Sequence, residues 1–160
     1  MRRNFLSLVR TWAPVAVWQA LIFIFSTDAF ASPHTSSFFA PLLSWLIPGI
    51  SPQMIHTLHG MIRKLGHWTE YFILAILLEK TIKTQWPEQS RRRRFTATVI
   101  VATLYAISDE GHQAFVPSRS ASAIDVAIDT CGAICGAFWT WHGERNSAAR
   151  GNAQQLVKKT

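Results

Sequence analysis

Side chains that could bind a ligand or transfer a proton are concentrated between Ser108 and Asp129, with an apolar run on each side. They are Asp109, Glu110, His112, Gln113, Arg119, Asp125 and Asp129. Ionisable groups inside or beside hydrophobic helices are costly unless they pair, bind something or do chemistry. Histidine and carboxylate groups suit a divalent metal ion or general acid–base catalysis, and the planar guanidinium of arginine suits a phosphate or a carboxylate.

A structural network is the alternative role for this segment. Asp109 or Asp125 could pair with Arg119, and His112 could donate to a carboxylate. Asp125 would also favour the N-terminus of the helix that follows it. In both cases we expect Arg119 to lie within direct or single-water reach of a carboxylate, because a buried guanidinium without a partner is too costly. The carboxylates considered are Glu70, Asp109, Glu110 and Asp125.

The spacing of the polar residues places them on shared helix faces. His67, Glu70 and Tyr71 follow an i, i+3, i+4 pattern, which puts them on one side of a helix. Two further sets follow similar spacing: Tyr105, Asp109, His112 and Gln113, and then Asp125, Asp129, Gly132 and Gly136. The glycines of the last set form a seam of small residues that lets a neighbouring helix approach closely.

Four apolar stretches predict an all-α integral membrane four-helix bundle. Hydropathy by itself supports one or two spans, and the others depend on charge placement and on the family resemblance described below. The expected helices cover residues 11–30, with Pro14 in the first turn, 66–84, 95–115 and 123–141. An apolar piece at residues 38–47, inside an outer loop of residues 31–62, predicts a short interfacial or re-entrant helix. Residues 1–141 would form the transmembrane domain, and residues 142–160 a polar cytoplasmic tail that is disordered or an exposed helix end.

The basic residues indicate how such a bundle lies in the membrane. If the N-terminus is inside, all of the 16 Lys and Arg residues except Arg63, Lys64 and Arg119 fall on the inner side. This bias follows the positive-inside rule and predicts a multi-pass protein of the bacterial inner (cytoplasmic) membrane with both termini in the cytoplasm. The net charge of +7 then implies membrane lipids as partners. The run of arginines at residues 91–94 also resembles a nucleic-acid patch, but its place at the inner end of a span favours topology, and no nucleic-acid partner is expected.

The same topology gathers the polar residues at the outer face. His67 and Glu70 lie in the outermost turns of one span, Asp109 in the last turns of the next, and Asp125 in the first turn of the fourth. Apart from terminal basic residues, every ionisable residue of the spans is expected at this face, with Ser26 and Asp28 closing the first helix. We therefore expect an outward-facing polar pocket walled by four helices. A secretory signal peptide, cleaved near Ala31, is an alternative for the N-terminal run.

Three segments carry a resemblance to a known family. The run SDEGHQAFVPSRSASAIDVAIDTCGAICG resembles the signature of the VanZ-like family of small bacterial membrane proteins. KLGHWTEYFILAILL and IFIFSTD are similar to two further elements of that family. One departure is Ser118, where the family pattern has glycine before the arginine. The resemblance implies a cell-envelope protein, and the family's name comes from a gene linked to glycopeptide antibiotic resistance.

Three functions are compatible with these observations. The first is a non-enzymatic accessory or binding protein of the envelope, which would engage a lipid-linked envelope component through Arg119, Gln113, Asp125 and Asp129. The second is a membrane-embedded hydrolase or transferase acting on a lipid-linked or phosphate-bearing substrate, with His67, Glu70, Asp109, Glu110 and His112 as catalytic candidates. The third is a small transporter, which the scarcity of polar residues in the inner half of the spans disfavours. The cofactor stays undetermined, a divalent metal ion being compatible with the donor types.

Overall fold

The computed structural model of the chain describes residues 5–27, 32–117, 119 and 121–157. Within these residues the chain forms helices and no strands, as the sequence predicts. The helices are α1 (Phe5–Phe25), α2 (Ser32–Leu46), α3 (Pro52–Gln85), α4 (Arg91–Gln113) and α5 (Ala123–Val157).

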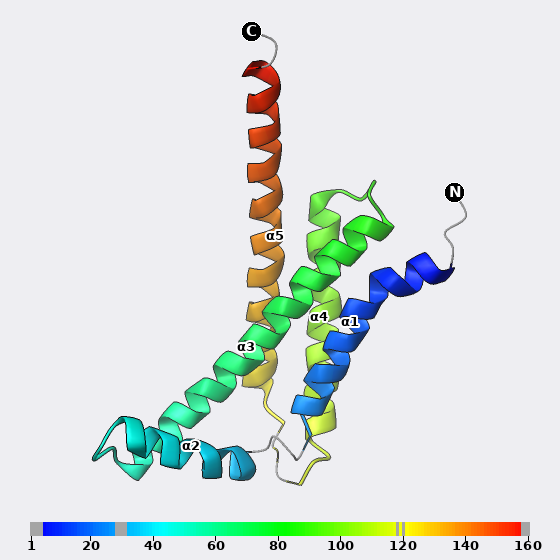
Figure 1. The fold of residues 1–160 in the computed structure, drawn as a ribbon. Helices are drawn as coiled ribbons and strands as arrows, with labels where there is room; N and C mark the ends of the chain where they lie inside the picture. Colours follow the sequence, from blue (N-terminus) through cyan, green and yellow to red (C-terminus); the bar gives the residue numbers. More distant parts are fainter. Residues whose placement is uncertain (1–4, 28–31, 118, 120, 158–160) are drawn as a thin grey trace.

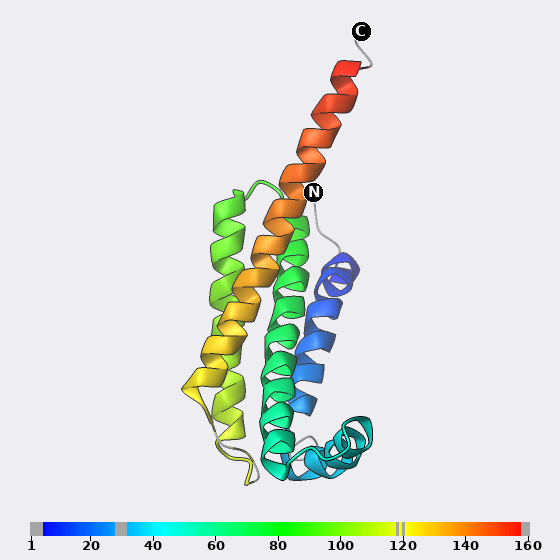
Figure 2. The same ribbon diagram turned by 90° about the vertical axis from the view of Figure 1, so that its left-hand side faces the viewer.

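The four long helices run alongside one another, and α2 lies across one end of the bundle (Figures 1 and 2). We call that end the α2 end and the opposite one, where α3 passes into α4, the α3–α4 end. Helix α1 begins and α5 ends on the side of the bundle away from α2 (Figure 1). Helix α3 is central, because it contacts each of the other four helices and packs most extensively against α5.

The start of α3 is set by local capping. The side chain of Ser51 accepts a hydrogen bond from the backbone N–H of Met54 at 3.3 Å, and Pro52 occupies the first turn, where its missing N–H costs nothing. The helix therefore starts at Pro52 rather than near residue 66, and part of the expected outer loop is helical. Ser90 caps α4 in the same way, through the N–H of Arg93 at 3.4 Å.

Two other helix ends also differ from the expected bounds. Helix α1 starts at Phe5, so Pro14 lies inside it and not in its first turn. Proline removes one backbone hydrogen bond and bends a helix, and α1 is visibly bent in its N-terminal part (Figure 1). Helix α5 continues to Val157 instead of ending near residue 141, so the helix extends into the expected tail.

Small residues form much of the helix contact. The core combines Tyr71, Leu74 and Leu78 of α3 with alanines of α4 and α5, and with Val15 and Ile22 of α1. The seam of α5 expected from Gly132 and Gly136 is confirmed: a Cβ at Gly132 would overlap the backbone carbonyl oxygen of Trp68, and a Cβ at Gly136 would overlap that of Phe72. The absence of side chains at these two positions lets α5 pack directly on the backbone of α3.

Side-chain hydrogen bonds to backbone carbonyls attach α1 to the bundle. Trp18 Nε1 donates to the carbonyl oxygen of Glu70 at 2.9 Å, and Tyr105 Oη donates to that of Gln19 at 2.7 Å. Near the α3–α4 end, Thr81 Oγ1 donates to the carbonyl oxygen of Thr11 at 3.1 Å. These contacts fix the rotation of α1, so that its C-terminal end closes over the polar residues at the α2 end.

Two helices of the described chain are long and apolar enough to cross a membrane. They are α1 and the Ala123–Arg145 part of α5, and both keep most of their residues unburied. Large apolar side chains such as Phe23, Leu104 and Phe138 are also exposed on the bundle. Helices α3 and α4 do not meet the same criterion, so the four-span bundle expected from the sequence is supported for two of its spans.

Candidate functional site

Most of the polar side chains expected to form a pocket are brought together at the α2 end. They come from the C-terminal end of α1, the N-terminal half of α3, the last turns of α4 and the first turns of α5. Gln113 and Asp129 are fully buried, and Asp109, Glu110 and His67 are nearly so. Asp28 lies outside the described residues. The co-location expected from topology and spacing is therefore present in the fold.

The deepest part of the site is a group of three side chains from three helices. His67 of α3, Glu110 of α4 and Asp129 of α5 each place one donor atom within 4.8 Å of the others. His67 Nδ1 lies 3.4 Å from Asp129 Oδ1, although the two atoms are not in hydrogen-bonding geometry. Neither oxygen of Asp129 has a hydrogen-bond partner among the described residues. These three side chains therefore bring nitrogen and oxygen atoms that lack hydrogen-bond partners close to one another inside the bundle.

Glu110 also organises the connection between α4 and α5. Its Oε2 accepts a hydrogen bond from the backbone N–H of Ser122 at 2.7 Å. Ser122 in turn caps α5, since its side chain accepts from the N–H of Asp125 at 3.3 Å. The other oxygen of Glu110, Oε1, is buried and has no hydrogen-bond partner among the described residues. The hydrogen bond to Oε2 thus fixes the orientation of the carboxylate, and Oε1 stays available to bind another group.

Asp109 and Gln113 form a second layer, one helical turn apart on α4. Gln113 Nε2 donates to Asp109 Oδ2 at 3.1 Å and lies 3.4 Å from Ser26 Oγ at the end of α1. Asp109 Oδ1 and Gln113 Oε1 have no hydrogen-bond partner within the described part of the chain. The amide therefore joins α1 to the cluster without satisfying all of its acceptors.

Asp125 has partners that the sequence argument did not assign to it. Lys64 Nζ donates to Asp125 Oδ1 at 2.9 Å, and Arg63 Nη2 lies 4.0 Å from Oδ2. The sequence did contain a signal, because Arg63, Lys64 and Arg119 are the basic residues that the charge pattern places on the outer side. All three lie at this site, so the exceptions to the positive-inside bias mark the polar cluster.

Among the described residues Arg119 forms no direct ion pair with a carboxylate, so its expected reach to one through a single water molecule stays a prediction. Its Nη2 donates to the backbone carbonyl oxygens of Phe25, at 2.6 Å, and Thr27, at 3.3 Å. The physical reason is that the C-terminal end of α1 presents unpaired carbonyl groups, which a nearby cation satisfies. Burial and the neighbouring Arg63 lower the pKa of Arg119, yet guanidinium stays protonated in proteins. Its buried Nε has no hydrogen-bond partner among the described residues.

His112 lies apart from the buried group. Its ring packs against Phe23 of α1, with 4.4 Å between the ring centroids. Its position on α4 is close in sequence to Glu110, but the helix turns it toward α1. It is neither part of the group of three nor part of the lining of the adjacent cavity.

A cavity of about 280 Å³ opens beside the cluster. It is lined by Phe25, Ser26, Arg63, Gly66, His67, Glu70 and Arg119. Two guanidinium groups, one imidazole and one carboxylic acid therefore share one small space. His67 belongs both to this cavity and to the buried group of three, so it connects them.

A second polar cluster lies at the α3–α4 end. The Arg94 Nη2 donates to both carboxylate oxygens of Glu144, at 3.0 and 2.7 Å. Arg94 Nε lies 3.5 Å from Glu79 Oε2, and Nη1 donates to the carbonyl oxygen of Gln89 at 3.1 Å. Glu79 and Arg94 are both buried. The expectation that all ionisable residues of the spans lie at one face is therefore wrong, because a charge can be buried at the other end when its partner is on a neighbouring helix.

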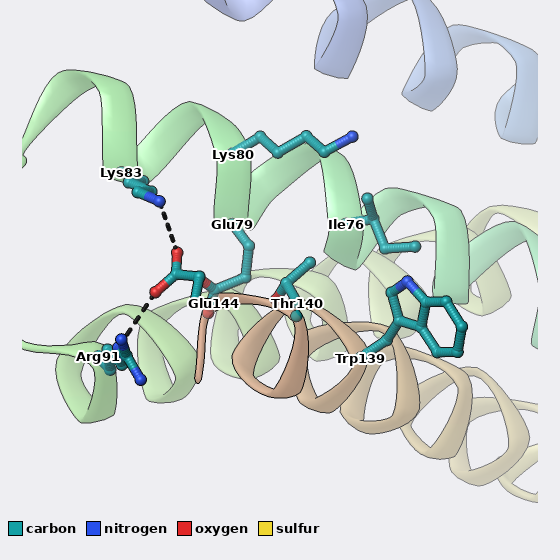
Figure 3. A pocket seen from close by; sticks show the side chains of 9 residues that line it. Ile76, Glu79, Lys80, Lys83, Arg91, Trp139, Thr140 and Glu144 are labelled. Atoms are coloured by element: carbon teal, nitrogen blue, oxygen red, sulfur yellow. Dashed lines mark ion pairs between the residues drawn. The ribbon is translucent and has the colours of Figure 1, made fainter. Parts of the chain in front are cut away.

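A cavity larger than the one at the α2 end lies beside this second cluster. It measures about 620 Å³ and is shown in Figure 3, where Lys83 and Arg91 approach Glu144 from two sides. The two ion pairs are 3.0 and 3.2 Å long. Most of its charged groups are paired with one another, so we interpret this cluster as a clamp that joins α3, α4 and α5.

Comparisons with known proteins identify the family but no individual relative. The family model described as VanZ/LLP1 matches residues 11–142. Comparison with curated proteins and with solved structures finds no match. The matched range contains every residue of the cluster at the α2 end, the candidate span of α1 from residue 11 onward and that of α5 up to residue 142. The family and the two apolar helices together indicate a membrane protein. The chain belongs to the VanZ/LLP1 family.

Proposed function

We propose that this protein is a multi-pass protein of the bacterial inner membrane that binds a phosphate-bearing envelope lipid in the cavity at the α2 end. In this proposal α1, α3, α4 and α5 all span, and the α2 end faces outward. The protein then acts as an accessory or binding protein of the cell envelope. The protein recognises the phosphate group of the proposed ligand, and its exposed apolar surface beside the cavity holds the lipid chain.

The observation that carries the proposal is the position of Arg119. Its Nη2 is held by the backbone carbonyl oxygens of Phe25 and Thr27 at the end of α1, and Arg119 lines the cavity together with Arg63. A guanidinium that is held in place loses little side-chain entropy when it binds, and it matches the geometry of a phosphate. The residues of the α1 end therefore support binding of an anionic group at this position.

Binding of a long-chain isoprenyl phosphate is expected to raise the melting temperature of the detergent-purified protein. The isoprenol of the same chain length, which lacks the phosphate, is expected to have little effect. Arg119→Gln should weaken binding of the phosphate by about 10–100-fold, the equivalent of one hydrogen bond to a charged group. Affinity is measured by titrating the lipid and following the melting temperature.

Arg93→Gln is the matched control, because Arg93 is an exposed arginine at the opposite end of the bundle. It should bind the phosphate as the unmodified protein does. An equal response to phosphate and alcohol would contradict the proposal, and so would an equal loss in the Arg93 and Arg119 variants.

A membrane-embedded hydrolase or transferase is the second candidate. The specific observation in its favour is that His67 and Glu70, one helical turn apart, line the same cavity. An imidazole and a carboxyl group at that spacing suit general acid–base chemistry on a phosphate ester. Time-dependent conversion of the bound lipid in the titration above would favour this candidate over simple binding.

The proposed orientation predicts where reporter fusions are active. Alkaline phosphatase requires an oxidising compartment for its disulfides, so a fusion after Gly49 should be active. Phosphatase fusions after Glu88 and at the C-terminus should be inactive, because these positions lie in the cytoplasm. A fluorescent reporter that folds only in the cytoplasm should be fluorescent at the same two positions. An active phosphatase after Glu88 would reverse the orientation and place the cavity on the cytoplasmic side.

A further inference from the structure

The geometry points to a divalent transition-metal site formed by His67, Glu110 and Asp129. The inference deepens the proposed function, on which it rests for its role beside a bound phosphate. The site itself is argued from the three side chains alone. One imidazole and two carboxylates are ligands that Zn²⁺ and Mn²⁺ accept, with Zn²⁺ favoured by the nitrogen donor.

The spacing of the donor atoms is close to that of a coordination sphere. Ligand bonds of about 2.0–2.1 Å in a tetrahedral zinc site place neighbouring ligand atoms about 3.3 Å apart. His67 Nδ1 and Asp129 Oδ1 are already 3.4 Å apart, and the whole set lies within 4.8 Å. The other distances within the group are at most 4.8 Å, so a bound ion requires them to shorten by about 1.5 Å or less.

The burial and missing partners of these atoms are the second observation. Asp129 is 0% exposed, Glu110 is 4% exposed and His67 is 7% exposed. His67 Nδ1, Glu110 Oε1 and both oxygens of Asp129 have no hydrogen-bond partner among the described residues. Buried polar atoms are normally satisfied, and buried carboxylates need a proton, a cation or a metal ion. Within the described chain no lysine or arginine pairs with Glu110 or Asp129.

The surroundings also resemble the outer shell of a metal site. The backbone N–H of Ser122 holds Glu110 Oε2 at 2.7 Å and so orients the carboxylate that presents Oε1. The ligands come from α3, α4 and α5, which the glycine seam of α5 holds closely together. Three protein ligands leave at least one coordination position open. Since His67 also lines the cavity, that position is available to an oxygen of a ligand bound there.

Zinc binding by the full chain is expected at about one ion per protein, as three protein ligands suit a single site. The protein should be purified without a polyhistidine tag, because such a tag binds metal itself. It is then equilibrated with ZnSO₄, and bound zinc is measured by mass spectrometry. Zinc should also raise the melting temperature, and Co²⁺ should give the visible absorption of a tetrahedral site. Mg²⁺ should have little effect, because it requires octahedral oxygen ligands.

The variants Glu110→Gln, Asp129→Asn and His67→Gln each remove one ligand while keeping the side-chain size. Gln at position 110 still offers an oxygen to the N–H of Ser122, so the start of α5 is preserved. Loss of an outer-shell partner costs about 10–100-fold in metal affinity, so loss of a ligand should cost more than about 100-fold. Glu88→Gln and His142→Gln make the same chemical changes at exposed positions away from the α2 end and should bind zinc normally.

The outcomes separate this inference from the proposed function. Folded, unmodified protein that binds no zinc and gives no Co²⁺ absorption would overturn the metal site, whether or not it binds the isoprenyl phosphate. Equal zinc binding by Glu110→Gln and Glu88→Gln would overturn it as well. Zinc binding that depends on the three ligands, in a protein that does not bind the phosphate, would support the metal site and overturn the proposed function alone.

Discussion

Gly136→Ala is expected to lower the free energy of unfolding by about 3 kcal/mol, the upper end of the usual cost of overpacking. The added methyl group would overlap the carbonyl oxygen of Phe72 and lie 3.1 Å from Ala75 Cβ. A backbone atom in the middle of α3 cannot rotate away as a side chain can. The two helices must therefore separate, which weakens contacts along the whole seam. Unfolding by heat or by sodium dodecyl sulfate, followed by circular dichroism, measures the change.

Gly143→Ala is the matched control on the same helix. A Cβ at Gly143 meets nothing within 4 Å, and alanine favours a helix over glycine by about 1 kcal/mol. This variant should be as stable as the unmodified protein or slightly more stable. Equal stability of the Gly136 and Gly143 variants would mean that α5 does not pack on α3 through this seam.

Arg94→Gln is expected to destabilise the protein by about 3–5 kcal/mol, because it leaves a buried carboxylate without its partner. Arg94 is 6% exposed and Glu79 is 7% exposed, so water replaces little of the lost interaction. Glu144 keeps Lys83 and Arg91, so most of the effect should arise from Glu79. The same unfolding measurements test the prediction, and added salt should change the result little, since buried pairs are weakly screened.

The neighbouring residue and a double variant provide the controls. Arg93→Gln removes an equal charge from an exposed position and should change stability by less than about 0.5 kcal/mol. Adding Glu79→Gln to Arg94→Gln removes the stranded charge and should recover part of the loss. No recovery in the double variant would show that the two side chains do not interact.

The helix faces that build the candidate site could be predicted from spacing. His67 and Glu70 on one helix, Asp109 and Gln113 on the next, and Asp125 and Asp129 on the last each follow helical periodicity. In a bundle of antiparallel helices, the C-terminal end of one helix lies beside the N-terminal end of the next. These faces therefore meet at the α2 end. The family resemblance was also correct, and it rests on the same charged residues.

Partner choice within the site could not be predicted in this way. Asp125 pairs with Lys64, Arg119 binds carbonyl oxygens of α1, and His112 packs on Phe23. Each pairing depends on the rotation of a helix about its axis and on the path of a loop. A sequence pattern determines neither, because a helix face about 100° wide is compatible with several neighbours.

The amino-acid sequence by itself determined the helical class, the family, and the gathering of polar groups at one end. Apolar runs and helical spacing are local properties of the sequence, and they do not depend on how the helices pack. The tertiary structure alone decided the buried clamp of Glu79 and Arg94 and the meeting of His67, Glu110 and Asp129. These features join residues that are far apart in the chain. The group of three depends on how closely α5 approaches α3, which Gly132 and Gly136 permit because no side chain separates the two backbones there.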